Sequence, residues 1–252
     1  MIQDKNERVI ETMEDWAEIY TSGNKTKHWK EGRSAYSIAD YVINHNGLEK
    51  IHSRVKDVLQ KEIKIERVIP EVEITFDKYG QGRVHDLGIY GENNSIFIGV
   101  EAKVDEPFGN LIIDTYLDSK IRQIGGESTK GPQRVEDLLG LHYGKPDKSV
   151  FNLRYQLLYS TVGTIGKITK QDATLRIESK FDISVLYIIV FKTHLYDDVK
   201  GIDNFRDYIN FLNALNAEEL ECSRQDSRVH RLSIGDKELI SIYEQVDLKS
   251  QD

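Results

Sequence analysis

Hydrophobic residues recur at two different periods along this chain, and the two periods predict two kinds of element. In residues 34–45 and 47–61 they recur every three to four positions, as in helices with one buried face. Residues 66–78, 84–91 and 95–104 are strand-like, and short clusters of Gly, Asn and Asp typical of turns separate them. We therefore expect two helices, the first capped by Ser34, followed by an antiparallel meander of three strands.

The second half of the chain alternates between helical and strand-like patterns. Residues 181–193 are apolar on both faces, which is typical of a strand in the middle of a sheet. The remaining expected elements are helices at 108–122, 134–142, 152–169 and 202–215 and a strand at 238–246. This order predicts an α/β fold in which helices cover a mixed sheet. With only 4 prolines and no low-complexity linker, residues 1–252 are expected to form a single domain.

Ionisable side chains that could take part in catalysis occur in the third strand of the predicted meander. Side chains alternate between the two faces of a strand, so Glu101 and Lys103 project from the same face. The opposite face is entirely apolar and consists of Ile96, Ile98, Val100, Ala102 and Val104. Glu101 and Lys103 are therefore predicted to lie on a strand whose other face packs in the core. The bland alternative is a solvated sheet face with Glu–Lys pairing across strands.

The same alternation predicts which residues of the neighbouring strands join this surface. In the second strand Asp86 shares a face with Val84, Gly88 and Tyr90, whereas His85, Leu87 and Ile89 take the other. In the first strand Glu71 and Glu73 lie opposite Val72, Ile74 and Phe76. Glu71 or Glu73, Asp86, Glu101 and Lys103 are thus expected on one surface.

These residue types suit the hydrolysis of a phosphodiester. Mg²⁺ and Mn²⁺ prefer oxygen ligands, typically one or two carboxylates with water and substrate phosphate. A metal held by Asp86 and Glu101 would bind the phosphodiester and lower the pKa of a bound water. Lys103 would position that water or stabilise charge that develops in the transition state.

Asp86 followed by Glu101-Ala102-Lys103 resembles the D…(D/E)xK signature of the PD-(D/E)XK nuclease superfamily. The resemblance covers about residues 47–195 and implies a restriction-endonuclease-like core, with the three-strand meander and a further strand in a mixed sheet flanked by helices. It implies Asp86 and Glu101 as metal ligands, the Ala102 carbonyl as a third ligand and Lys103 as the catalytic lysine. Position 85 departs from the signature, because His85 stands where the motif's name has proline.

Further residues are implied as supporting parts of such a site. Glu49, Glu71 or Glu73 would stand for the upstream acidic residue of many members, and Gln156 for a polar residue on a later helix. Arg33, Lys130 and Arg154 are candidate phosphate contacts, and Glu106 either assists the metal or complements a helix dipole. The alternatives are a capping role for Gln156 and a surface position for Arg154, and Trp29 beside Arg33 is expected to be a packing anchor.

Composition narrows the class of partner only partly. The net charge of -8 argues mildly against nucleic-acid binding, but the excess of acid is mostly C-terminal: residues 195–252 hold 13 acidic and 7 basic residues, whereas residues 119–154 hold 7 basic and 4 acidic ones. DNA is the expected partner of a metal-dependent endonuclease, and the alternatives are a nuclease acting on RNA and a non-catalytic binding module. The sequence leaves open whether two copies form a homodimer.

The cysteine content, the apolar runs and the first residues of the chain predict its cellular location. The single cysteine, Cys222, cannot form an intrachain disulfide, which favours a reducing compartment. No apolar run approaches the roughly 18 residues that cross a bilayer, and the first residues do not resemble a signal peptide. We expect a cytoplasmic protein with no membrane partner.

Overall fold

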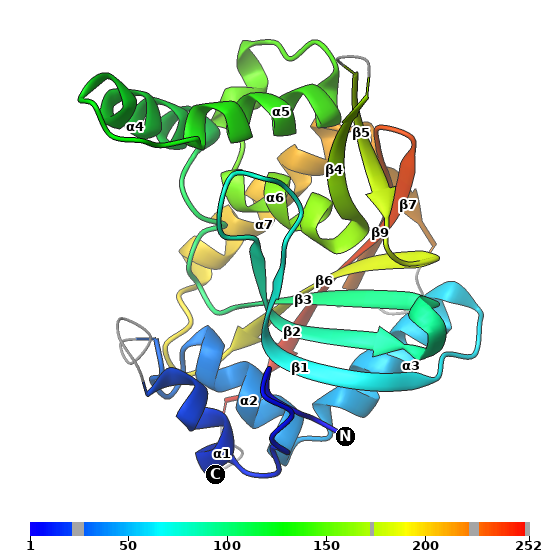
Figure 1. The fold of residues 1–252 in the computed structure, drawn as a ribbon. Helices are drawn as coiled ribbons and strands as arrows, with labels where there is room; N and C mark the ends of the chain where they lie inside the picture. Colours follow the sequence, from blue (N-terminus) through cyan, green and yellow to red (C-terminus); the bar gives the residue numbers. More distant parts are fainter. Residues whose placement is uncertain (22–27, 172–173, 222–226, 250–252) are drawn as a thin grey trace.

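The centre of the molecule is a seven-stranded sheet with the strand order β1-β2-β3-β6-β9-β8-β7 (Figure 1). The computed structural model describes residues 1–21, 28–171, 174–221 and 227–249, so Cys222 lies outside the described residues. The strands of this sheet are β1 (Ile65–Ile74), β2 (Arg83–Gly91), β3 (Ile96–Lys103), β6 (Ile183–Lys192), β7 (Glu218–Leu220), β8 (Ser227–Ile234) and β9 (Lys237–Asp247). A separate hairpin consists of β4 (Gly166–Gln171) and β5 (Thr174–Ser179).

The pairing of these strands is mixed. β1, β2 and β3 form an antiparallel meander, as the sequence predicts. β6 pairs in parallel with both β3 and β9, and its central position agrees with the burial of nearly all its side chains on both faces. β9 then continues antiparallel to β8, and β8 to β7. The expected α/β fold with a mixed central sheet is confirmed.

Helices cover both faces of the sheet and divide the core in two. The α-helices are α1 (Met13–Ala17), α2 (Ser34–Asn44), α3 (Gly47–Leu59), α4 (Ile112–Ile124), α5 (Gly131–Tyr143), α6 (Tyr155–Ile165) and α7 (Asp198–Ala214). Short 3₁₀ helices are η1 (Glu18–Tyr20), η3 (Glu92–Asn94) and η4 (Lys148–Asn152).

Each face of β3 and β6 packs against a different group of helices. On one face, Ile38 of α2 and Ile51 of α3 pack with Val100 and Ala102 of β3, as the apolar pattern predicts. On the other face, Ile188 of β6 packs with side chains of α5, α6 and α7. β3 is therefore buried on both sides, and Glu101 and Lys103 lie between the sheet and the α6 layer rather than on an open face.

Several expected boundaries differ from the structure. The helices expected at 108–122, 134–142 and 202–215 span Ile112–Ile124, Gly131–Tyr143 and Asp198–Ala214. The helix expected over 152–169 ends at Ile165, and the chain enters the β4–β5 hairpin, which the sequence reading missed together with β7 and β8. The first strand ends at Ile74 instead of residue 78. Arg33, not Ser34, occupies the N-cap of α2, because Ser34 already has helical backbone and its hydroxyl hydrogen-bonds Glu106.

None of the helices described here is long and apolar enough to cross a membrane.

Candidate active site at the ends of β2 and β3

The first residues of β2 and the last residues of β3 meet at the same end of the sheet because the two strands are antiparallel. Their paired residues run from Leu87 opposite Val100 to Tyr90 opposite Phe97, so this ladder stops just before Asp86. Beyond it, Asp86 Oδ2 accepts a hydrogen bond from the backbone N–H of Ala102 at 2.7 Å. The Asp86 side chain, and not a carbonyl of the partner strand, is thus the acceptor for this N–H. The Asp86 carboxylate therefore lies beside the Glu101-Ala102-Lys103 segment.

β1 contains an irregularity directly beside this point. Glu71 has a φ of 50°, in the left-handed region that residues other than glycine rarely adopt. Before it, Val68 packs in the core under α2 and α3, whereas Val72 after it packs with Phe97 on the opposite face. The inward and outward positions of β1 therefore exchange at Glu71.

Beside this irregularity and the end of the β2–β3 ladder, two expectations from strict alternation are wrong. His85 does not lie with Leu87 but on the face of Glu101, where its ring contacts that of Phe97. Glu73 does not join Asp86 and Glu101, because it is exposed and its Oε1 accepts the N–H of Gly82 at 2.7 Å. Glu71 alone of the two upstream acids is brought near Asp86, and its charge helps to raise the pKa of that residue.

The carboxylates of Asp86 and Glu71 form the acidic side of the site. Burial, followed by the charge of Glu71, raises the pKa of Asp86 to about 6, although Lys103, Arg83 and the N–H of Ala102 act in the opposite direction. Tyr20 of η1 donates a hydrogen bond to Glu71 Oε1 at 2.6 Å. Burial and the charges of Glu71 and Asp86 raise the pKa of Tyr20, so its phenol stays protonated. The negative charges of Glu71 and Asp86 therefore repel each other in a largely buried position.

Lys103 supplies the positive charge next to these acids. Its side chain is only 7% exposed, and Glu101 only 2%, so the alternative of a solvated sheet face is wrong. Burial lowers the pKa of Lys103, whereas Asp86 and Glu106 raise it. The ammonium also lies 5.6 Å from the centre of the Phe108 ring. This environment holds the lysine between Asp86 and Glu106.

Glu106 binds the backbone just after the end of β3. Its Oε2 accepts the backbone N–H of Val104 at 2.9 Å and that of Asp105 at 3.1 Å. Burial raises its pKa, but Lys103, Ser34 and these backbone groups outweigh burial and leave the pKa lowered. Glu106 does not complement the α4 dipole, because α4 begins only at Ile112.

Glu101 is surrounded by donors on the α6 side of the sheet. Arg83 contacts it with two nitrogens, one of them Nε at 2.9 Å from Oε1. His85 Nδ1 lies 2.7 Å from Oε1, Gln156 Nε2 donates to Oε2 at 3.0 Å and Ser160 Oγ donates to Oε1 at 3.4 Å. Gln156 thus contacts Glu101, and it does not cap α6, whose N-cap is Arg154. Arg83 and His85 were missed, although His85 at the motif's proline position was a visible signal.

His85 is neutral in this arrangement. Burial and then the charge of Arg83 lower its pKa well below the usual range, so Nδ1–H donates to Glu101 and Arg83 balances the carboxylate charge. The ring fits because Gly99 carries no side chain: a Cβ there would lie 2.7 Å from His85 Cε1. The small residue at position 99 therefore sets the position of the imidazole.

Several other predicted residues lie elsewhere. Arg33 pairs with Asp105 at 2.9 Å, and Arg154 pairs with Asp207 at 2.6 Å, so both have partners within the chain. Glu49 is exposed on α3 and is not among the groups that shift the pKa of Asp86, and Lys130 is exposed at the start of α5. Trp29 stacks on Tyr20 with ring centres 5.1 Å apart, which confirms its role as a packing anchor.

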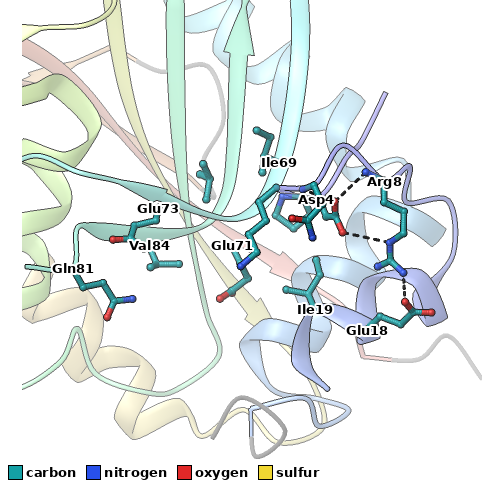
Figure 2. Close-up of a pocket in the computed structure, with 13 residues that line it drawn as sticks. Asp4, Arg8, Glu18, Ile19, Ile69, Glu71, Glu73, Gln81 and Val84 are labelled. Atoms are coloured by element: carbon teal, nitrogen blue, oxygen red, sulfur yellow. Dashed lines mark hydrogen bonds and ion pairs between the residues drawn. The ribbon is translucent and has the colours of Figure 1, made fainter. Parts of the chain in front are cut away.

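A pocket of about 870 Å³ opens beside β1 and the N-terminal segment (Figure 2). Glu71, Glu73 and Val84 line it from the strands, and Asp4, Arg8 and Glu18 line it from the N-terminal side. Figure 2 shows the ion pairs that link Arg8 to Asp4 and to Glu18. Glu71, whose charge affects Asp86, lines the pocket, whereas Asp86, Glu101 and Lys103 do not.

A protein-family model described as "Domain of unknown function (DUF6946)" matches residues 9–243, which include every residue of this site. Searches of curated proteins and of solved structures give no match.

Proposed function

We propose that this chain, which belongs to the DUF6946 family, hydrolyses phosphodiester bonds of DNA as a metal-dependent endonuclease. The observation that carries the proposal is the hydrogen bond from Ala102 N–H to Asp86, which joins the two halves of the D…ExK pattern at one end of the sheet. Glu101 and Lys103 flank Ala102 and are both buried there. Buried ionisable groups with perturbed pKa values are a common feature of catalytic sites.

The order of the elements supports the finer assignment to a restriction-endonuclease-like core. α3, β1, β2, β3, α6 and β6 follow one another along the chain, with an antiparallel meander and β6 parallel to β3. This is the helix, three strands, helix and strand order on which the resemblance rests. α4, α5 and the β4–β5 hairpin are insertions around it, and β7, β8 and β9 extend the sheet beyond β6.

The donor atoms of the site are of the kind that bind a divalent cation. Asp86 and Glu101 offer the carboxylate oxygens that Mg²⁺ and Mn²⁺ prefer, and the Ala102 carbonyl adds a third candidate. The raised pKa of Asp86 reports unfavourable burial and repulsion from Glu71, which a cation would relieve. Within the described residues no group of three or more His, Cys, Asp or Glu side chains is arranged for metal binding. Both carboxylate oxygens of Glu101 already contact Arg83. Glu101 must exchange at least one of these contacts to act as a metal ligand.

The residues around Asp86 and Glu101 have distinct roles in this proposal. A bound cation supplies Lewis acidity to the phosphate and acidifies a water. Lys103 orients that water or stabilises charge developing on the phosphorus oxygens, because its ammonium is buried and already balanced by Asp86 and Glu106. Gln156 and His85 orient the Glu101 carboxylate through hydrogen bonds.

The test is a cleavage assay on supercoiled plasmid, linear duplex, single-stranded DNA and RNA with Mg²⁺ or Mn²⁺. We expect metal-dependent cleavage that falls roughly 10²-fold or more in Lys103→Met and Asp86→Asn, the scale seen when a group that stabilises the transition state is removed. Lys61→Ala changes an exposed lysine and is the matched control. Cleavage that persists in Lys103→Met, or no cleavage of any substrate, contradicts the proposal.

A second candidate is a binding module that keeps the nuclease fold without catalysis. The observation that favours it is the full set of donors on Glu101, because a carboxylate held by Arg83, His85 and Gln156 is stable without a metal. This candidate predicts retention of DNA on a filter or in a gel without cleavage, and no change in unfolding temperature when Mg²⁺ or Mn²⁺ is added. Metal-dependent cleavage by the wild type excludes it.

A further inference from the structure

Arg83, the first residue of β2, holds both oxygens of the Glu101 carboxylate. Its Nε donates to Oε1 at 2.9 Å, and its Nη2 contacts Oε2. The planar guanidinium presents its N–H donors as a fork that matches the two oxygens of a carboxylate, and the same fork matches two oxygens of a phosphate. Arg83 is 7% exposed and Glu101 2%, so the two charges of this pair balance each other in a buried position.

The stem of Arg83 is held by α6, whereas its guanidinium has a second partner nearer the surface. A Cβ at Gly163 of α6 would lie 2.6 Å from Arg83 Cβ and 3.1 Å from its Cγ, so the helix backbone packs against the stem. At the other end, the guanidinium carbon lies 5.0 Å from the centre of the Tyr159 ring, and Nη1 lies 3.4 Å from the Tyr159 hydroxyl. Tyr159 is partly exposed. The guanidinium therefore lies between a buried carboxylate and the surface of α6.

Both oxygens of Glu101 are already engaged by hydrogen-bond donors. Oε1 contacts Arg83, His85 and Ser160, and Oε2 contacts Arg83 and Gln156. Of these four partners Arg83 alone contacts both oxygens, and its guanidinium stays charged at every physiological pH. Arg83 is therefore the partner that competes most directly with a metal ion for this carboxylate.

We propose that Arg83 is a substrate-binding residue that exchanges partners: it holds Glu101 before a cation binds, and it holds the phosphate of the substrate afterwards. This inference rests on the proposed function, in which Glu101 is a metal ligand. A guanidinium that left Glu101 without a new anion would be buried and unpaired, which is strongly unfavourable. A phosphate supplies that anion in the same forked geometry, while Glu101 keeps a positive partner in the cation. The exchange thus leaves each buried charge balanced.

The first test is the affinity of the full chain for Mn²⁺ alone, measured by electron paramagnetic resonance of the free ion. Arg83→Lys keeps the positive charge but cannot hold both oxygens of Glu101 in a fork. We therefore expect this variant to bind Mn²⁺ at least several-fold more tightly than wild type. Arg231→Lys is the matched control and should bind like wild type, because Arg231 pairs with Glu218 at 2.9 Å and lies on β8, three strands away from β3 in the sheet.

The outcomes of this titration separate the exchange from the proposed function. Equal Mn²⁺ affinities of Arg83→Lys and wild type, beside metal-dependent cleavage by the wild type, overturn the exchange alone. A wild type that binds no Mn²⁺ overturns the exchange together with the proposed function. Circular dichroism shows whether Arg83→Lys is folded. If it is not, Arg83→Gln, which keeps one side-chain donor, is measured in its place with the same expected direction.

The second test is the binding of DNA without cleavage, measured by fluorescence anisotropy of a labelled duplex with saturating Mn²⁺. Lys103→Met is the background for all variants, because the proposed function predicts that it does not cleave. Adding Arg83→Lys should weaken DNA binding at least several-fold although it strengthens metal binding, whereas adding Arg231→Lys should change neither. A purely structural role of Arg83 does not move the two affinities in opposite directions. Unchanged DNA affinity in the folded Arg83→Lys/Lys103→Met variant overturns the phosphate contact.

Discussion

The carboxylate of Asp86 accepts the backbone N–H of Ala102 at 2.7 Å, which ties the start of β2 to the end of β3 through a side chain. The strand ladder has already stopped at Leu87 opposite Val100. Asp86 therefore satisfies a backbone donor that would otherwise be buried without a partner. The same contact places its second oxygen near the charges of Glu71 and Lys103.

Asp86→Asn is expected to stabilise the protein at neutral pH. The folded-state pKa of Asp86, about 6, is above its ordinary value of 3.8, so ionisation destabilises the fold as pH rises from 3.8 to 6. An asparagine still accepts the N–H of Ala102 but carries no charge, so the free energy of unfolding should rise by about 3 kcal/mol at pH 7. Urea unfolding measures the change.

Asp114→Asn on the exposed surface of α4 is the control and should leave stability almost unchanged. A loss of stability in Asp86→Asn would show that the negative charge is required for the fold.

Arg83→Ala should be strongly destabilising because it leaves the carboxylate of Glu101 buried without its main counter-charge. Removing one partner of a buried ion pair typically costs about 3–5 kcal/mol. Arg83 also lies over the ring of Tyr159, with its guanidinium carbon 5.0 Å from the ring centre. The measurement is a double-mutant cycle of Arg83→Ala and Glu101→Gln in urea unfolding.

The cycle separates the ion pair from packing. If the pair carries the effect, the double variant is clearly more stable than the sum of the two single losses predicts. Additive losses would instead assign the effect of Arg83 to its contact with Tyr159.

Gly99→Ala should disturb the site through His85. The added methyl would lie 2.7 Å from His85 Cε1, and the ring is fully buried, so ring or strand must move. Overpacking of this kind typically costs about 1–3 kcal/mol. Thermal unfolding measures the loss, and Gly125→Ala is the control because its Cβ would meet no atom closer than 3.5 Å. Equal unfolding temperatures of the two variants would contradict this role of Gly99.

Stability should depend on pH through His142, which lies outside the candidate site. Its Nδ1 lies 2.7 Å from the carbonyl of Leu138 and its Nε2 2.7 Å from Thr161 Oγ1, and burial lowers its pKa from 6.5 to about 4. Below pH 6.5 the unfolded chain binds a proton that the folded chain does not, so stability is lost as pH falls from 6.5 toward 4. The full effect is about 3 kcal/mol.

His142→Gln isolates this contribution, because glutamine does not titrate. The variant should be less stable than wild type at pH 8, and the difference should narrow by about 3 kcal/mol as the pH is lowered to 4. Urea unfolding at several pH values measures it. A difference that is constant across this range would mean that His142 keeps its ordinary pKa in the folded protein.

Periodicity was enough to predict the elements whose burial is regular. The apolar face of residues 96–104 and the two apolar faces of β6 follow the period of two, and both are buried where that period places them. α2 and α3 follow the period of a helix. β7, β8 and the β4–β5 hairpin were missed because they are short, partly exposed or directly continuous with a helix, so their local patterns are weak.

For the candidate site, the sequence by itself determined that Glu101 and Lys103 share one face of β3 and that Ala102 lies in the core behind them, because alternation is a property of any regular strand. The tertiary structure decided which neighbours join them. The left-handed backbone of Glu71 reverses alternation in β1, and the end of the β2–β3 ladder turns Asp86 toward Ala102 and His85 toward Glu101. Such irregularities depend on contacts between strands distant in sequence. Local periodicity therefore predicts the strands but not their exceptions.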